Sequence, residues 1–392
     1  MFTTVPRICV RYECVPMRFI KHVYKIHTYT QEGRLFEGKT PASAFLNSSY
    51  DGSFIAGLME LRYIQSLPVE RIINYFESHG FTLKKPTAHK LMEKASSLFE
   101  NLYKCIRQTA LSDPYKAADE TYYKILVPEK NSKGKGVRKG YLWVVVGINT
   151  RMIYLLYDDG SRSERVILNE LGSCKGIIQS DGYSPYRKLE SDAYPNITRI
   201  PCLQHIKRKF IDCGEKDPDA KRIVELINAL YQNEHKHKVG VEGWTVEQNL
   251  MHRKKYAPDI LGEIKDVFDE IEERGDLLPK SELQEAITYL RNEWNAVVDI
   301  FNYGDTYLDN NMVERMNRYI SLSRKNSLFF GSHKGAERGA ILYTIALTCR
   351  MHKVNLFEYL TDVINRTAEW QPNTPIEKYR ELLPDRWEKA ND

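Results

Sequence analysis

Long hydrophobic runs are missing from this chain of 392 residues. No stretch reaches the roughly 18 consecutive apolar residues that suggest a membrane-spanning helix, so we expect no membrane partner. The opening sequence, MFTTVPRICVRYECVPMRF, also lacks an apolar core behind a basic start, which argues against a secretory signal peptide. We therefore expect a cytoplasmic protein.

A cysteine framework is also missing. The seven cysteines are scattered and odd in number, a pattern that favours reduced thiols over disulfides. Cys9 and Cys14 could form half of a zinc site, but no second Cys/His pair follows nearby at zinc-finger spacing. We therefore predict no metal at the N-terminus.

Neither sign of charge is in strong excess. Lysine and arginine number 57 against 52 aspartate and glutamate residues, a net charge of +5. This mildly basic balance is compatible with a nucleic-acid partner but does not establish one. The length and the 42% hydrophobic content indicate a globular chain of two or three domains.

The N-terminal part predicts short strands and then helices. Residues 8–30 alternate loosely and predict two strands, and residues 31–50 have the composition of a linker, so 1–50 is taken as one segment. Residues 51–112 change to helical periodicity, with helices expected at 52–66, 68–80 and 86–111.

Two interpretations of these helices stay open. A turn followed by a helix that starts with Thr87, His89 and Lys90 is typical of a helix-turn-helix, in which Lys84 and Lys85 would contact DNA phosphates. A plain three-helix bundle with solvated lysines fits the same pattern.

The hydrophobic period changes again in residues 113–213. Strands are expected at 119–127, 140–148, 152–158, 176–181 and 197–202, with helices at 164–171, 184–192 and 203–213. The order β-β-β-α-β-α-β-α is that of a ribonuclease H-like mixed sheet with helices on both faces. We therefore predict an α/β fold with the first part of its core here.

Two aspartates fall at predicted strand ends. Asp119 is expected to open the first core strand and Asp181 to close the fourth, where Gly182 would let the backbone turn away. These strands are neighbours in the predicted topology, so the two carboxylates could meet. Aspartate at a strand end is also an ordinary turn-former, and that alternative stays open.

A helical pattern interrupts the core at residues 214–302, which we interpret as an all-helical insertion. Its helices are expected at 220–238, 245–257, 258–275 and 281–301. Trp244 and Trp294 could contact an unstacked DNA base, although we favour core packing. Residues 303–370 should complete the core with helices that pack on the sheet, and 371–392 should form a polar surface tail.

The stretch 309–331, DNNMVERMNRYISLSRKNSLFFG, predicts a capped helix whose apolar residues recur from Met312 to Ile320. Glu314 lies off that apolar stripe. It could be a metal-binding carboxylate on a rigid helix, or it could form an ordinary surface ion pair with Arg318.

Basic side chains flank the predicted acids in sequence. They would neutralise DNA phosphates, although runs of charge are usually solvated faces. The candidates are Lys207, Arg208, Lys209, Arg315, Arg318, Arg324 and Lys325.

Cys202 and His205 form a C-x-x-H pair at a strand-to-helix junction. We favour a structural role for them near Asp181, by packing and hydrogen bonding. A structural zinc site needs four ligands. The conceivable partners are Cys213, His235 and His237.

Five segments together resemble the DDE transposases of the insertion-sequence sixty-six family. In the family's order they are ADET (118–121), QSDGY (179–183), PCLQHIKRKF (201–210), DNNMVER (309–315) and SRKNSLFFGSHKGAERGA (323–340). The resemblance implies a ribonuclease H-like core with an inserted helical domain. It also implies a catalytic triad of Asp119, Asp181 and Glu314.

The front of the chain departs from that family. Members commonly carry a Cys-rich, zinc-ribbon-like segment ahead of the helical region, whereas KIHTYTQEG here contains no C-x-x-C. We interpret the front as shortened or degenerate. An active enzyme, an idle relic that binds DNA, and a metal nuclease that cuts without joining are the alternatives.

Three carboxylates can hold a pair of Mg²⁺ ions, with Mn²⁺ as a substitute. In our hypothesis Asp119 bridges the two ions, and Asp181 and Glu314 each hold one. The chain would cut DNA at the ends of an insertion sequence and join the freed 3′-hydroxyl to target DNA. Expected partners are DNA, a second copy of the chain and accessory proteins of the same element.

Overall fold

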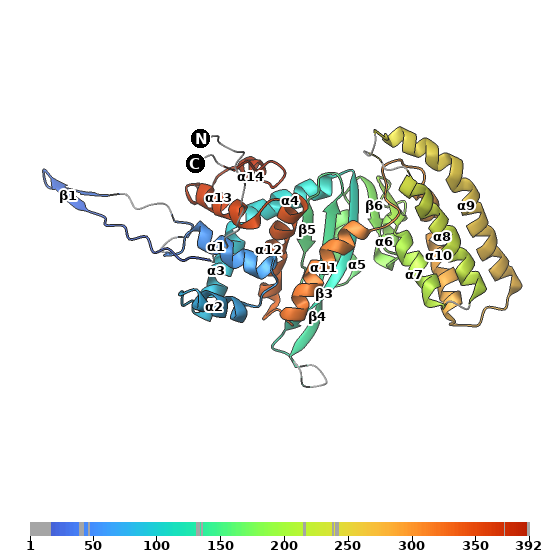
Figure 1. The fold of residues 1–392 in the computed structure, drawn as a ribbon, viewed down its shortest axis with the longest axis horizontal. Helices are drawn as coiled ribbons and strands as arrows, with labels where there is room; N and C mark the ends of the chain where they lie inside the picture. Colours follow the sequence, from blue (N-terminus) through green and yellow to red (C-terminus); the bar gives the residue numbers. More distant parts are fainter. Residues whose placement is uncertain are drawn as a thin grey trace, which may run out of the picture.

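The computed structural model describes residues 17–38, 43–45, 48–130, 134, 136–214, 217–236, 239, 243–371 and 373–389. Cys9, Cys14, His237 and the first part of the expected N-terminal strands lie outside these residues. A five-stranded sheet occupies the middle of an elongated molecule, with a helical bundle at one end and a thin hairpin at the other (Figure 1). No helix in the described residues is both long and apolar enough to cross a membrane.

The sheet is mixed and has the strand order β5-β4-β3-β6-β7. An antiparallel meander is formed by β3 (Tyr115–Leu126), β4 (Val137–Gly147) and β5 (Ile153–Leu156). Two further strands, β6 (Gly176–Ser180) and β7 (Ile197–Pro201), add in parallel. The prediction that the first and fourth core strands are neighbours is confirmed, because β3 pairs directly with β6.

The central strand β3 begins earlier than predicted, at Tyr115, so Asp119 lies inside the strand and does not open it. The residues ahead of Asp119, YKAA, include lysine and two alanines, which are depleted in strands, and this hid them from the sequence pattern. Pairing with β4 on one side and β6 on the other imposes the strand. Buried Lys116 is satisfied there by the carbonyl oxygens of Asp113 and Lys175.

Helices lie on both faces of the sheet, and the side chains of β3 alternate between them. Asp119 and Tyr123 point to the face of α11 (Asn311–Asn326). Glu120 points to the opposite face, where the hydroxyl of Tyr186 in α6 (Ser184–Arg187) donates to it. The helix predicted at 184–192 is shorter in the structure, because α6 ends at Arg187 and a 3-10 turn follows at Lys188–Glu190.

Helix α5 (Glu164–Leu171) connects β5 to β6, and α7 (Leu203–Asp212) follows β7. Both match their predicted positions closely. α7 packs against α8 (Pro218–Lys236) and α10 (Glu282–Ile300) of the helical bundle, and α10 itself packs on β7 and so links the bundle to the sheet.

The N-terminal hairpin differs from the prediction. β1 (Thr28–Gln31) and β2 (Arg34–Glu37) lie partly in the expected linker. Glu32 and Gly33 both have positive φ, the conformation of a two-residue hairpin turn, and this turn sets the register. Every residue of both strands is exposed.

The helical region before the sheet contains α1 (Gly52–Tyr63), α2 (Val69–Ser78), α3 (Lys85–Leu98) and α4 (Glu100–Ser112). The single helix expected at 86–111 is wrong, because it breaks at the fully buried Phe99. Both halves pack on α12 (His333–Met351), but α3 also packs on α1, whereas α4 also packs on β4 and β5. A helix-turn-helix role for this region stays a prediction.

The insertion consists of α8 (Pro218–Lys236), α9 (Val246–Arg274) and α10 (Glu282–Ile300). The predicted break at Pro258 is wrong, because α9 runs through it. Proline has no N–H group, so the carbonyl of Lys254, four residues earlier, lacks its usual helical donor. Pro258 and Lys254 are both exposed, so water can donate to that carbonyl. Trp294 packs edge-on against Phe268.

The C-terminal helices are α12 (His333–Met351), α13 (Leu356–Ala368) and α14 (Ile376–Glu381). α12 covers the free edge of β5, where the Thr344 and Thr348 hydroxyls accept strand N–H groups. α13 packs mainly on α1 and not on the sheet, contrary to expectation. The expected surface tail is also wrong in part, since Leu382 and Leu383 are buried.

Candidate functional site: carboxylates on the central strands and on helix α11

Strand register brings the positions of Asp119 and Asp181 close together. Ala117 pairs with Gln179 in the parallel β3–β6 ladder, and Asp119 and Asp181 each follow their paired residue by two positions. Strand β6 ends at Ser180, so Asp181 is the first residue after it. The two acids are in electrostatic contact, because the charge of Asp181 contributes to the raised pKa of Asp119 after burial and the charge of Glu120.

Helix α11 is tied to β3 next to Asp119. The Nδ2 of Asn317 donates to Asp119 Oδ2 at 2.6 Å, and the Nδ2 of Asn310 donates to the carbonyl of Ala118 at 3.1 Å. Glu314 lies one turn before Asn317 on the same helix. The three acids predicted from the sequence therefore lie within β3, directly after β6, and on the helix that docks on β3.

Helix α11 differs from the predicted helix in two details. Asn310 precedes the helix, but its side chain binds β3 and does not cap the helix. The buried side of the helix is also rotated from the predicted stripe. It consists of Val313, Met316, Asn317, Ile320 and Ser323.

A cavity of about 780 Å³ opens beside the docked helix. Among the described residues its lining includes Asp119 and Glu314 but not Asp181. The other lining residues are largely polar or basic: His205, Asn311, Arg315, Asn317, Arg318, Ser321, Leu322 and Lys325. A cavity lined by two carboxylates and several cations suits an anionic ligand held close to bound metal.

Crowding of negative charge perturbs Asp119. Burial raises the pKa of Asp119 to about 8, and the charges of Glu120 and Asp181 add to the rise. Hydrogen bonds from the Glu120 N–H and from Asn317 act in the opposite direction. A divalent cation would reverse this repulsion, so the residues present fit a hard metal ion.

Glu120 is a fourth carboxylate beside this group, and our sequence reasoning gave it no role. Burial raises the pKa of Glu120, and hydrogen bonds from Arg162 lower it. The guanidinium of Arg162 donates to Glu120 Oε1 from both Nε and Nη2, at 3.0 and 2.5 Å. These contacts hold Glu120 on the opposite face of the sheet from α11.

The backbone at Asp181 is fixed by the insertion. The Gly182 N–H donates to the hydroxyl of Tyr289 in α10 at 2.8 Å, and a Cβ on Gly182 would lie 2.5 Å from that oxygen. Gly182 has no left-handed φ, so close approach explains the glycine and the predicted turn does not. Arg199 donates to the Asp181 carbonyl at 2.7 Å and forms a buried ion pair with Glu293.

The predicted basic residues are placed in different ways. Arg315, Arg318 and Lys325 line the cavity. Arg324 instead binds the Tyr122 carbonyl of β3 and stacks on the Tyr122 ring, which gives it a structural contact. The remaining candidates lie on α7 and in the N-terminal helices.

On α7, Arg208 is exposed. The ammonium groups of Lys207 and Lys209 lie over the rings of Tyr231 and Tyr289. Lys84 immediately precedes α3, and Lys85 pairs with Glu70 at 2.6 Å. Phosphate contacts by these lysines stay a prediction.

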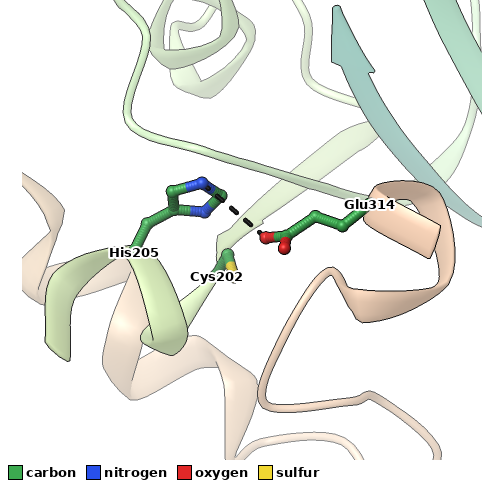
Figure 2. Close-up of side chains that lie close together, drawn as sticks. All are labelled: Cys202, His205 and Glu314. Carbon is green, nitrogen blue, oxygen red and sulfur yellow. Dashed lines mark ion pairs between the residues drawn. The ribbon is translucent and has the colours of Figure 1, made fainter. Parts of the chain in front are cut away.

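Glu314 also meets the C-x-x-H pair (Figure 2). Its Oε1 lies 3.7 Å from His205 Nε2, and Cys202 completes a cluster whose candidate ligand atoms lie within 4.8 Å of one another. Among the described residues Glu314 therefore pairs with His205, while the surface ion pair with Arg318 is not formed. Glu314 was not among the partners that we expected for Cys202 and His205.

Asn317 is the other important residue that we missed. Asn317 lies three residues after Glu314, so the two side chains are neighbours on one face of the helix. This spacing is the sequence signal that points to Asn317. The buried Asn310 had no comparable signal, because only the tertiary docking on β3 explains it.

Comparisons with known proteins identify the family of the chain. Residues 47–338 match the model of the transposase IS66 family. Proteins y4jD and y4hP of Sinorhizobium fredii (strain NBRC 101917 / NGR234), both described as uncharacterized, are 25% and 24% identical to the chain. Those alignments cover 91% and 97% of this chain and 70% of each relative. The family match spans most of the chain, and the chain therefore belongs to the IS66 family of transposases.

Proposed function

We propose that this chain is a DDE transposase that cuts DNA at the ends of an insertion sequence and joins the 3′-hydroxyl ends to target DNA. The observations that support the proposal are that the β3–β6 register places Asp181 near Asp119 and that Asp119 and Glu314 line one cavity beside the docked helix α11. The strand order also supports a ribonuclease H-like core.

The three acids have a shared role in this proposal. Asp119, Asp181 and Glu314 would together hold the Mg²⁺ ions. When bound, the ions would supply an activated water and neutralise charge on the reacting phosphate. Asn317 keeps the Asp119 carboxylate oriented toward the cavity through its hydrogen bond.

The basic side chains in the cavity bind the DNA. Arg315, Arg318 and Lys325 lie along the helix that carries Glu314, so they would contact phosphates on either side of the reacting one. Lys207, Arg208 and Lys209 extend this surface along α7. Two copies of the chain act together during synapsis in the cytoplasm, with accessory proteins of the same element.

Cleavage of DNA that carries the element's ends tests the proposal. We expect Mg²⁺- or Mn²⁺-dependent nicking by the parent chain and a loss of at least about 100-fold in Asp119→Asn, Asp181→Asn and Glu314→Gln. Glu337→Gln, at an exposed position of α12, is the matched control and should cut normally. Cleavage that persists in any of the three variants would contradict the assignment of that residue.

A further inference from the structure

A second group of ligand-type side chains lies next to the proposed catalytic acids. Cys202 directly precedes α7, His205 lies in its first turn, and Glu314 comes from α11 across the interface (Figure 2). Their candidate ligand atoms all lie within 4.8 Å of one another. Within the described residues this is the one such group of three metal-ligating side chains.

Hydrogen bonding leaves the polar atoms of this group unsatisfied. His205 Nδ1 and Glu314 Oε1 are both buried without a hydrogen-bond partner in the described structure. Such atoms are rare in folded proteins, because each one loses its contact with water without compensation. Cys202 Sγ is likewise buried, and it accepts the Asn310 backbone N–H at 3.2 Å. A hydrogen bond of this kind stabilises a metal-bound thiolate.

The donor set determines which class of ion fits. Sulfur and imidazole nitrogen favour a soft or borderline ion, whereas Mg²⁺ prefers oxygen ligands. Zinc binds sulfur at about 2.3 Å and nitrogen or oxygen at about 2.0–2.2 Å, so tetrahedral ligands are separated by roughly 3.3–3.8 Å. Contraction of this group by about 1 Å reaches that geometry, and the long side chain of Glu314 can supply it.

We propose that Cys202, His205 and Glu314 bind a zinc-class divalent ion, distinct from the Mg²⁺ ions proposed at Asp119 and Asp181. Three protein ligands leave the fourth coordination position open to water or to a DNA oxygen. The cavity that His205 and Glu314 line gives the ion a route of access.

This site has a consequence for catalysis that rests on the proposed function. Glu314 belongs to both ligand sets, so an ion held by Cys202 and His205 competes for the carboxylate that cleavage needs. Zinc added at constant Mg²⁺ should therefore inhibit cleavage. The inhibition should weaken in His205→Gln, measured relative to the zinc-free rate of that same variant.

Binding of Zn²⁺ alone, without DNA or Mg²⁺, tests the site itself. The parent for this experiment carries Cys9→Ser, Cys14→Ser and Cys213→Ser, so the buried Cys105, Cys174 and Cys349 are the thiols that remain outside the group. Equilibrium dialysis with elemental analysis should give one zinc per chain. Glu314→Gln and His205→Gln should each weaken binding by more than the roughly 10–100-fold that loss of an outer-shell partner causes.

Cobalt provides a second readout that identifies the sulfur ligand. Co²⁺ bound to the parent should show a thiolate-to-cobalt charge-transfer band, and Cys202→Ser should lack it. Cys202 is buried, so its replacement could disturb folding. His205 is more accessible, and the His205→Gln variant therefore repeats the test of cobalt binding, with folding checked by circular dichroism. Asp119→Asn should keep the zinc site.

Two results would overturn the proposal: no zinc bound by the parent, or zinc bound equally by the parent and by His205→Gln and Glu314→Gln. The proposed function fails separately. If Glu314→Gln loses zinc but still cuts DNA, the zinc site stands and the catalytic role of Glu314 is wrong.

Discussion

Asn317 of helix α11 donates a 2.6 Å hydrogen bond to Asp119 at the centre of strand β3. These residues are far apart in sequence, and the bond joins the helix that carries Glu314 to the strand that carries the first acid. The distance between the two carboxylates is therefore set by the docking of one helix on one strand.

Replacement of Asn317 by alanine should reduce both cleavage and stability. The buried Asp119 would lose its side-chain donor, and a hydrogen bond to a charged group contributes about 1.5–3 kcal/mol. We expect cleavage to fall by about 10- to 100-fold, because both Asp119 and α11 lose orientation. Single-turnover cleavage and thermal unfolding measure the two effects.

Asn326→Ala is the matched control for Asn317→Ala. Asn326 lies on the same helix and donates to the Ser66 carbonyl, away from Asp119. Equal cleavage by the two variants would show that the Asn317 contact does not orient the site.

The metal-free protein should lose stability as pH rises because of Asp119. Its pKa is about 8 in the folded chain, above the ordinary 3.8. A carboxyl with a raised folded pKa contributes its full stability below the unfolded value and loses it as pH rises through the folded value. The Asp119→Asn variant does not undergo this loss. In EDTA, the melting temperature of the variant minus that of the parent should therefore increase between about pH 4 and pH 8.

Asp259→Asn, at an exposed position of α9, should follow the parent curve. Mg²⁺ should raise the melting temperature of the parent and close much of the gap to Asp119→Asn. Parallel melting curves for the parent and Asp119→Asn across this pH range would contradict the account of Asp119.

Gly182→Ala should destabilise the chain through a clash with Tyr289. The added Cβ would lie 2.5 Å from the Tyr289 hydroxyl and 2.6 Å from the ring carbon that bears it. Overpacking of this kind typically costs about 1–3 kcal/mol. Tyr289→Ala should relieve part of that cost, and a double-mutant cycle by chemical denaturation measures the coupling. Additive effects would mean that the two residues do not meet.

Glu293→Gln should be strongly destabilising. It removes one of the two carboxylates that pair with the buried guanidinium of Arg199. Glu190 remains at 2.5 Å, so the cost should lie at or below the roughly 3–5 kcal/mol of a fully broken buried pair. The exposed Glu285→Gln on the same helix should change stability far less. Cleavage should also fall, since Arg199 holds the Asp181 carbonyl. Equal unfolding free energies for the two variants would remove this support for Asp181.

The sequence predicted the order of the core strands because their hydrophobic period is regular and their connections are short. It also singled out Asp119, Asp181 and Glu314 as residues of interest. It did not predict that β3 starts at Tyr115, because alanine and lysine conceal a strand whose pairing on both sides imposes it.

Other misses have the same physical origin in tertiary contact. Pro258 predicts the end of a helix from the local sequence. Helix α9 continues through it because the helix is exposed to water at this point. Phe99 has no helix-breaking character, yet burial divides the helix there. The association of Glu314 with Cys202 and His205 depends on how α7 and α11 pack, which no local pattern encodes.

The most direct test of the central claim is the location of Mn²⁺ in crystals of the protein, read from anomalous scattering. We predict ions bound by oxygen atoms of Asp119, Asp181 and Glu314 together, at the roughly 2.0–2.3 Å typical of hard cations and carboxylates. Ions bound elsewhere, or bound to the two aspartates with Glu314 remaining outside their coordination sphere, would contradict it.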